Sequence, residues 1–335
     1  MNPPTYCKGA LWSNLYIGKD TIAQQVDFFL QKSKSLPIDI LIDLVDMDKQ
    51  PPVLSLIGHH QAAPALQILS VTITQEPTTL TPGSEAGFIT LKSPFSAVPV
   101  IATLTLPLCH LPRNTDILLC SPSLKHLIIN SPSYFFPALN WNWVYSAVRA
   151  VQNLQSLTFK GPPAIMRPSL STMLVQGTYV CEAPYLTSID ITAPEWGIKI
   201  MRDIIAPLLK KVRIDALGQR ELFMPSQTWV RECESIAKAF VHLSRTSSLI
   251  THMELCGIDL PSSGEFTAHS LLGGAFPMLE HLTLNDANID DSAFAEYSSG
   301  LPNLRYLKIV ASPGIGGDGF LSFMANRRDT FQLVL

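Results

Sequence analysis

Apolar residues recur along the chain with a fixed short spacing, in which the first, fourth and sixth residues of a segment are apolar. The spacing is clearest in Phe276–Leu284 (FPMLEHLTL) and in Leu301–Ile309 (LPNLRYLKI). It can be followed through nine triplets: Leu66/Leu69/Val71, Ile101/Leu104/Leu106, Leu124/Leu127/Ile129, Leu154/Leu157/Phe159, Leu186/Ile189/Ile191, Leu209/Val212/Ile214, Ile250/Met253/Leu255, Leu279/Leu282/Leu284 and Leu304/Leu307/Ile309. A segment that recurs in this way predicts an internally repeated architecture.

Each triplet predicts a short strand with one apolar side. Its fourth and sixth residues alternate, so they point to the same side of a strand, and its first residue leads the chain into that strand. One such strand cannot bury its apolar side alone, but stacked copies form a parallel sheet over a continuous core. Parallel strands need long crossovers. The first residues of successive triplets are 23 residues (Ile101 to Leu124) to 41 residues (Leu209 to Ile250) apart, which is long enough for such crossovers.

These intervals contain apolar residues at helical spacing. We expect helices over Ser226–Ser244, Trp141–Val151, Glu195–Leu208, Asp290–Leu301 and Gly317–Asn326. Proline comes shortly before several triplets, where it should stop the incoming helix and set an extended approach. The dipeptides are Ala63-Pro64, Ser121-Pro122, Ala183-Pro184, Phe276-Pro277 and Leu301-Pro302. The predicted fold class is therefore α/β, a solenoid with a curved parallel sheet and variable helical crossovers.

The N-terminal part of the chain is less regular. We expect a cap region over residues 1–60, continuous with the solenoid, and irregular repeats over 61–335. Within these we expect a strand at Leu11–Ile17, an amphipathic helix at Thr21–Ser33, a strand at Leu36–Asp43, a short helix at Val53–Ala63, a loop at Gln75–Ser96 and a last strand at Phe331–Leu335.

Composition narrows the possible partners and the compartment. The formal net charge of −3 gives no electrostatic reason to expect nucleic acid or an anionic membrane. No run of about 18 apolar residues occurs, so we expect no membrane span. The cysteines are scattered and form no C-x-x-C pair, which predicts reduced thiols in a cytoplasmic or nuclear protein. The segment MNPPTYCKGALW also lacks the basic start and apolar stretch of a signal peptide.

The sequence gives little reason to expect chemistry. It contains no G-x-S-x-G, H-E-x-x-H or Walker motif, and we expect neither a cofactor nor a metal. Gly314–Gly319 (GIGGDG) has the bare spacing of a phosphate-binding loop, but it lacks a lysine and no further unit of a nucleotide fold follows it. We therefore interpret it as a turn of the repeat. A different class of function is the alternative to a non-enzymatic protein. In that alternative the chain is an enzyme on an irregular α/β fold, and it uses a thiol or this loop.

The third, fifth and seventh positions of each repeat should point away from the core, onto the concave face of the sheet. His126, His252 and His281 all occupy the third position. Any polar residue suits an exposed strand position, so the three histidines need no function to explain them. The functional alternative is that they belong to a strip of residues that contacts a partner. The candidate strip comprises His126, Asn130, Lys160, Asp190, Lys211, Arg213, Asp215, His252, Glu254, His281, Asn285, Tyr306 and Lys308. Cys256 also falls at an outward position. The mixed charge of the strip favours a folded protein or peptide as the partner, because solenoids bind partners on such extended surfaces.

The repeats resemble those of leucine-rich-repeat proteins. The resemblance rests on SPSLKHLIINSP (121–132), VQNLQSLTFKGPP (151–163), FPMLEHLTLNDANID (276–290) and LPNLRYLKIVASPGI (301–315). Two further phrases, ALWSNLYI (10–17) and VDFFLQKSKSLPIDILID (26–43), resemble the fungal F-box/leucine-rich-repeat group. The chain departs from the family where Ala287 replaces the usual asparagine or cysteine, so a regular asparagine ladder is not expected.

The narrower resemblance implies a non-enzymatic module that recognises the substrate of a ubiquitin ligase. In that group an F-box stands upstream of the phrase that starts near Leu11. Binding to a ubiquitin-ligase adaptor is therefore expected only if an F-box precedes Met1. The alternative within the same class is a stand-alone scaffold with no role in ubiquitin transfer.

Overall fold

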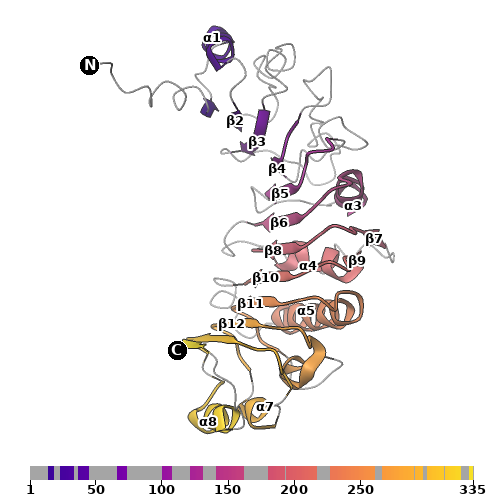
Figure 1. The fold of residues 1–335 in the computed structure, drawn as a ribbon, viewed down its shortest axis with the longest axis vertical. Helices are drawn as coiled ribbons and strands as arrows, with labels where there is room; N and C mark the ends of the chain where they lie inside the picture. The colour runs from indigo at the N-terminus through magenta and orange to yellow at the C-terminus, as the bar shows by residue number, and fades with distance from the viewer. Residues whose placement is uncertain are drawn as a thin grey trace, which may run out of the picture. The chain divides into compact units, whose positions relative to one another are not determined.

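The computed structural model describes fifteen segments of the chain: residues 14–18, 23–33, 37–44, 66–73, 100–107, 121–130, 141–161, 180–192, 194–216, 227–260, 266–289, 291–296, 300–312, 314–325 and 332–334. The chain forms two compact units, Met1–Thr158 and Phe159–Leu335. Each unit contains parallel strands and helices (Figure 1).

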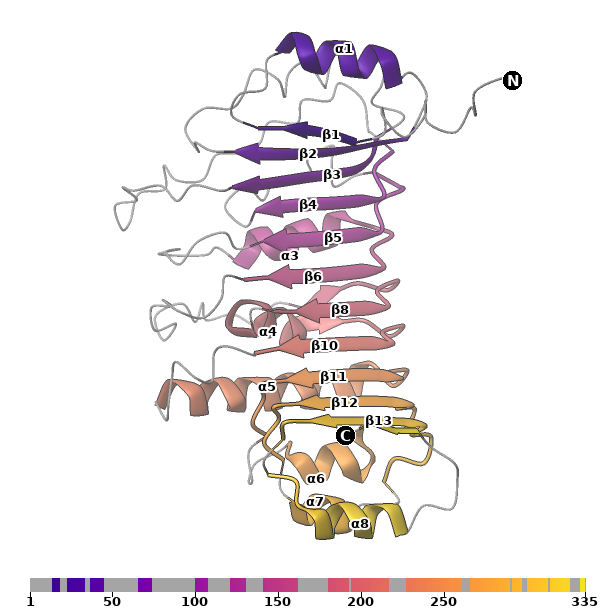
Figure 2. The same ribbon diagram turned by 90° about the vertical axis from the view of Figure 1, so that its left-hand side faces the viewer.

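The first unit contains a parallel sheet whose strands follow one another in chain order. Its helix α1 lies beside β1 at the sheet edge (Figure 2). Its elements are β1 (Asn14–Ile17), α1 (Ala23–Ser33), β2 (Ile38–Leu44), β3 (Leu66–Ile73), β4 (Thr103–Pro107), β5 (His126–Asn130) and α3 (Trp141–Ala150). The next strand, β6 (Ser156–Lys160), contains the boundary between the units.

The second unit repeats this plan of parallel strands and helices, and its helix α5 is 20 residues long. Its strand order is β8-β10-β11-β12-β13-β14, and all five neighbouring pairs are parallel. Helices α4 and α5 lie behind the strands in Figure 2. The elements are β7 (Cys181–Glu182), β8 (Ser188–Ile191), α4 (Pro194–Asp203), β9 (Ile204–Ile205), β10 (Lys211–Asp215), α5 (Gln227–Thr246), β11 (His252–Cys256), α6 (Ala268–Ser270), the π-helix η8 (Leu271–Ala275), β12 (His281–Asn285), α7 (Asp291–Glu296), β13 (Tyr306–Val310), α8 (Gly317–Ala325) and β14 (Gln332–Val334).

The apolar triplets form the core, as their spacing predicts. From Ile101 to Ile309, every residue of the eight later triplets is at most 8% exposed, and Leu69 of the first triplet is 4% exposed. Each large aliphatic side chain buried in this way contributes about 1.5–3 kcal/mol of transfer free energy, so the repeated spacing is also the main source of stability. The predicted class, an α/β solenoid built on a parallel sheet, is confirmed.

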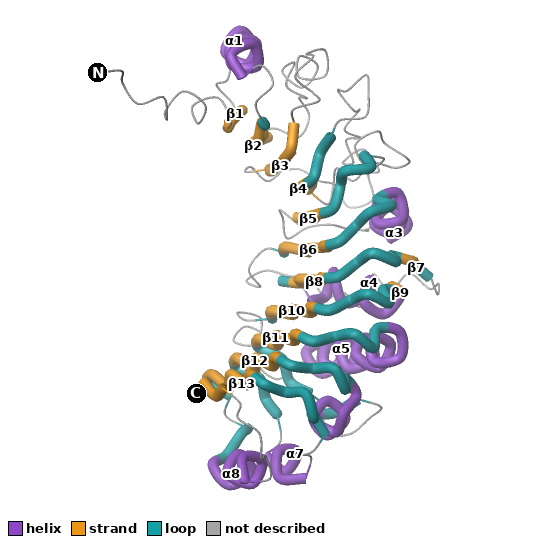
Figure 3. Tube along the Cα trace, in the orientation of Figure 1, coloured by secondary structure: helices purple, strands orange, loops and turns teal. Residues whose placement is uncertain are grey.

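A tight turn precedes the strand in successive repeats. The amide of Leu279 donates to the carbonyl of Phe276 at 3.0 Å, and the amide of Leu304 donates to that of Leu301 at 3.1 Å. Pro277 and Pro302 therefore occupy the second position of a four-residue turn, where the fixed φ of proline is already suitable. The sequence predicted that these prolines stop a helix, and the structure shows that they also shape the turn that leads into the strand. Figure 3 shows the loops that carry these turns leading into the strands.

Most predicted helices are present, and two are clearly shorter than predicted. The segments expected at Trp141–Val151, Ser226–Ser244 and Gly317–Asn326 correspond to α3, α5 and α8 within two residues. The helix expected over Glu195–Leu208 ends at Asp203, because Ile204–Ile205 forms β9 and pairs in parallel with β7. Two consecutive β-branched residues favour this extended conformation.

The helix expected over Asp290–Leu301 begins at Asp291 as α7, and the structure describes it to Glu296. The strands predicted near the two ends of the chain are present as β1, β2 and β14, and the predicted amphipathic helix is α1, with Val26 and Phe29 buried. The short helix expected at Val53–Ala63 and the loop expected at Gln75–Ser96 lie outside the described residues.

Candidate protein-recognition surface

The predicted strip residues all occupy alternate strand positions whose side chains are exposed or half-buried. His126 and Asn130 belong to β5 in the first unit. The others lie on strands β6 to β13: Lys160, Asp190, Lys211, Arg213, Asp215, His252, Glu254, His281, Asn285, Tyr306 and Lys308. The intervening residues of the same strands are the buried triplet residues, so the alternation predicted from the sequence is present.

Strand register arranges the outward residues of the second unit in rows that cross the strands. The first row runs through Ser188, Lys211, His252, His281 and Tyr306. The second row runs through Asp190, Arg213, Glu254, Thr283 and Lys308. Directly opposed side chains on neighbouring strands are close enough to interact. The two rows therefore determine which side chains form contacts on this face.

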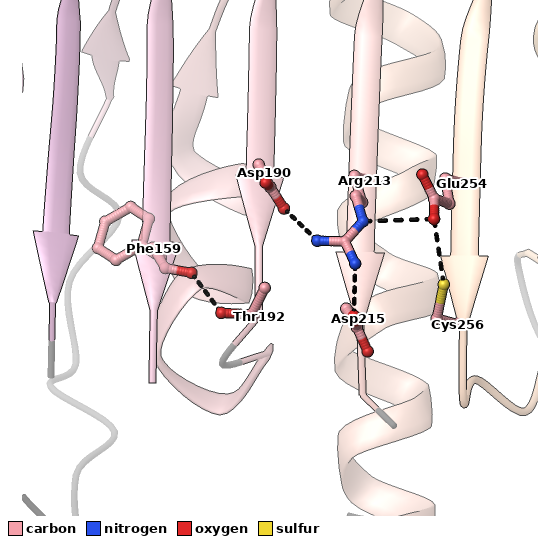
Figure 4. Close-up of polar contacts among 7 residues, drawn as sticks. All are labelled: Phe159, Asp190, Thr192, Arg213, Asp215, Glu254 and Cys256. Carbon is pink, nitrogen blue, oxygen red and sulfur yellow. Dashed lines mark hydrogen bonds and ion pairs between the residues drawn. The ribbon is translucent and has the colours of Figure 1, made fainter. Parts of the chain in front are cut away.

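Arg213 is the centre of an ion-pair cluster in and beside the second row (Figure 4). Its guanidinium lies 3.1 Å from Asp190, 2.6 Å from Asp215 and 3.4 Å from Glu254. Desolvation alone would lower the pKa of Arg213, but the surrounding carboxylates outweigh it and the pKa lies above its usual value. Arg213 is thus held in place by this chain's own carboxylates.

Two imidazole rings and a phenol ring lie side by side in the first row. The rings of His252 and His281 stack with centroids 4.2 Å apart and planes 9° apart, and the centroid of Tyr306 lies 5.5 Å from that of His281. Desolvation, followed by the neighbouring His281 and Lys211, lowers the pKa of His252, while Glu280 opposes the shift. The three rings therefore lie next to one another along the first row as a ring cluster, in which burial and neighbouring charges make His252 harder to protonate.

The ring cluster lines part of an open hollow of about 350 Å³. Ile189, Val212 and Met253 also line the hollow, and because their side chains point to the core they contribute strand backbone to its base. Its polar lining comes from both rows: Ser188, Asp190, Lys211, Arg213, His252, Glu254, His281, Thr283 and Tyr306. A hollow lined by charged and aromatic groups offers ion pairs, hydrogen bonds and ring contacts to a side chain of a partner.

Cys256 is not part of the exposed face, contrary to the sequence prediction. It follows Glu254 at an outward position of β11, yet only 1% of it is exposed, and its thiol donates to the Glu254 carboxylate at 3.6 Å. Burial, followed by Asp215 and Glu254, raises the pKa of the thiol to about 12. Cys256 therefore stays protonated at neutral pH and is a poor nucleophile.

The glycine-rich segment near the C-terminus binds a carboxylate of this chain. The amide of Gly316 donates to Oδ1 of Asp291 at 2.8 Å, and the amide of Gly319 donates to Oδ2 of the same residue at 3.2 Å. The amides that would hold a phosphate in the enzymatic alternative thus hold Asp291 at the start of α7. This geometry agrees with the interpretation of the segment as a turn of the repeat.

Within the second unit, the structure brings together only part of the predicted strip. Asp190, Lys211, Arg213, His252, Glu254, His281 and Tyr306 line the hollow, with Asp215 beside it, whereas Lys160, Asn285 and Lys308 lie outside its lining. The sequence analysis missed the Arg213 cluster. The signal was available, because Asp190, Arg213 and Glu254 share the fifth position of three successive repeats. Among the described residues, no group of three or more His, Cys, Asp or Glu side chains could hold a metal ion.

None of the described helices is long and apolar enough to cross a membrane. No family model matches the chain, and no curated protein matches it. Among solved structures, the chain is similar to the crystal structure of the Rad7 and Elc1 complex in yeast, with a TM-score of 0.44 and 14% sequence identity. That similarity covers 96% of this chain and 74% of the other chain.

Proposed function

We propose that this chain is a non-enzymatic module that binds a protein partner through the outward face of strands β8 to β13. The observation that carries the proposal is the hollow over Val212 and Met253, lined by charged and aromatic side chains from neighbouring strands. Tyrosine and arginine are enriched among residues that dominate binding at interfaces, and Tyr306 and Arg213 both line this hollow.

The arrangement also supports recognition with little loss of conformational freedom. Arg213 is held by ion pairs, and His281 is held between two aromatic neighbours. Side chains that are already ordered lose less entropy when a partner binds. The face therefore has the preorganised character that an interface requires.

The direct test replaces Lys211, Arg213 and Tyr306 with alanine together and measures capture of binding partners. We expect capture to be abolished while the thermal unfolding transition is retained. A matched control replaces Lys238, Arg245 and Tyr185, which are exposed on α5 and before β8, and removes the same three residue types. Unchanged capture by the first variant, or equal loss in both, would contradict the proposal.

A narrower form of the proposal is that the partner is a substrate of a ubiquitin ligase. It is supported by the resemblance of ALWSNLYI (10–17) and VDFFLQKSKSLPIDILID (26–43) to the fungal F-box/leucine-rich-repeat group. Mapping the 5′ end of the native transcript tests it. An in-frame upstream F-box would support this form, and adaptor binding would then be expected. A transcript that begins at Met1 would instead leave a recognition module without a role in ubiquitin transfer.

A further inference from the structure

We propose that the hollow of the second unit binds an acidic side chain of the partner, held by Lys211 and the His252–His281 pair, and that binding takes up a proton. This inference rests on the proposed function, because it names the chemistry of the partner segment that the same face would recognise. It is argued from the first row of the face, where a cation lies beside two imidazoles and a tyrosine.

Lys211 is the cation of the hollow that remains available. The two carboxylates that line the hollow, Asp190 and Glu254, are held by Arg213 at 3.1 Å and 3.4 Å. Within the described part of the chain, no carboxylate lies within ion-pair distance of the Lys211 ammonium, which is exposed. A carboxylate from a partner would therefore find an unpaired cation at the first row.

One ring nitrogen of His252 is already held by this chain. The Thr251 hydroxyl and Nδ1 of His252 lie 2.8 Å apart and share a hydrogen bond in which either group can be the donor. Nε2 takes no part in that hydrogen bond. In the imidazolium both ring nitrogens carry a proton, so Nε2 then donates to a carboxylate whichever tautomer the neutral ring adopts.

The surroundings keep His252 neutral until an anion arrives. Burial of the ring acts on it most, followed by His281 on β12, Lys211 on β10 and Glu280, the residue before β12. The Arg213–Glu254 pair shares the same hollow. Lys211 and His281 disfavour a further positive charge, and only Glu280 favours it. A partner carboxylate would add a negative charge beside the ring and reverse this balance, which raises the pKa of the imidazole.

Proton uptake on binding makes the affinity depend on pH. The pKa of His252 in the free protein lies below its usual value of 6.5, and the bound carboxylate moves it upward. At pH values between the free and the bound pKa of His252, binding requires the uptake of one proton. The affinity therefore falls by up to about tenfold for each unit by which the pH rises. Binding of a neutral or basic segment would lack this dependence.

The experiment is an NMR titration of the histidine ring protons in the full chain, with acetylated tetraglutamate as the probe and tetralysine as its opposite. The variants His252→Asn and His281→Asn each remove one histidine signal, which identifies the ring-proton resonances of His252 and of His281. We expect tetraglutamate to raise the pKa of His252 and to bind more tightly at lower pH. Tetralysine should produce neither effect.

Two charge variants locate the effect on the face. Lys211→Met should greatly reduce the response to tetraglutamate, whereas Lys308→Met, on the same face but outside the lining of the hollow, should preserve it. An unchanged His252 pKa with saturating tetraglutamate, or an equal response to tetralysine, would overturn the inference. Such a result together with loss of capture in the triple alanine variant would leave the proposed function intact, so the two failures are distinguishable.

Discussion

At the scale of single residues, position within the repeat determines the role of a side chain. A residue such as Val212 joins the core because it stands at the fourth position, while its neighbours Lys211 and Arg213 face outward. Register then brings residues of equal position together, which is how Arg213 reaches Asp190 and Glu254 on the strands at either side. The polar contacts of the face thus follow from the same repeat that builds the core.

The Arg213 cluster should contribute modestly to stability. We expect Arg213→Met to lower the free energy of unfolding by about 1–2 kcal/mol at low ionic strength, because exposed ion pairs are individually weak and three are lost together. The loss should shrink in high salt, which screens these charges. Denaturant unfolding at two salt concentrations measures it.

The control for this prediction is Lys308→Met, which removes one positive charge from the same face. The part of the chain that the structure describes gives Lys308 no ion pair. We expect a change of less than about 0.5 kcal/mol, as for most surface substitutions. Equal effects of the two substitutions would show that the cluster adds nothing beyond net charge.

The sequence predicted which residues face outward but not how they pair. His252, His281 and Tyr306 could be placed in one row because the triplets fix the register, and the structure shows the two imidazoles stacked with the Tyr306 ring tilted beside them. Cys256 does point to the outward side, where its thiol donates to Glu254, but it is only 1% exposed there, and alternation does not predict that burial. Interactions across strands depend on side-chain reach, which periodicity does not encode.

At the scale of elements, loops between the repeats are fixed by specific backbone contacts. The segment before α8 is an example, because its glycine amides hold the carboxylate at the start of α7. The sequence predicted a turn here but gave no sign of Asp291 as its ligand, since the two segments are 25 residues apart. Helix limits were predicted less well where a competing strand forms, as at Ile204–Ile205.

Two glycines of α8 should respond oppositely to alanine. A Cβ at Gly319 would collide with the carboxylate and the carbonyl of Asp291, whereas a Cβ at Gly317 would meet nothing within 4 Å. We expect Gly319→Ala to lower the free energy of unfolding by about 1–3 kcal/mol, as overpacking does. Gly317→Ala should be neutral or stabilise by up to about 1 kcal/mol, because alanine favours the helix.

Thermal or denaturant unfolding of the two variants measures this contrast. Similar stability of both would show that α7 and α8 are not held together by the Asp291 contacts. Because the two substitutions have the same chemistry and lie two residues apart in one helix, differences in the unfolded state largely cancel.

At the scale of the whole molecule, the repeats create outward surfaces. The strands bury their triplets and leave the alternate side chains outside. In the second unit these side chains form an open hollow with stacked imidazole rings and paired charges. The recognition of another protein and the preference for an acidic segment are proposals that rest on this hollow. The sequence predicted the alternation that creates the face, but not the hollow itself.

The most direct test of this account is site-specific photo-crosslinking to a captured partner. A photoreactive residue at position 283 replaces Thr283 within the hollow, and the same residue at position 238 replaces the exposed Lys238 on α5. The account predicts partner adducts from position 283 and none from position 238, with the adducts lost in the triple alanine variant. Adducts from position 238 alone, or in equal yield from both positions, would contradict the claim that the outward face of β8 to β13 is the recognition surface.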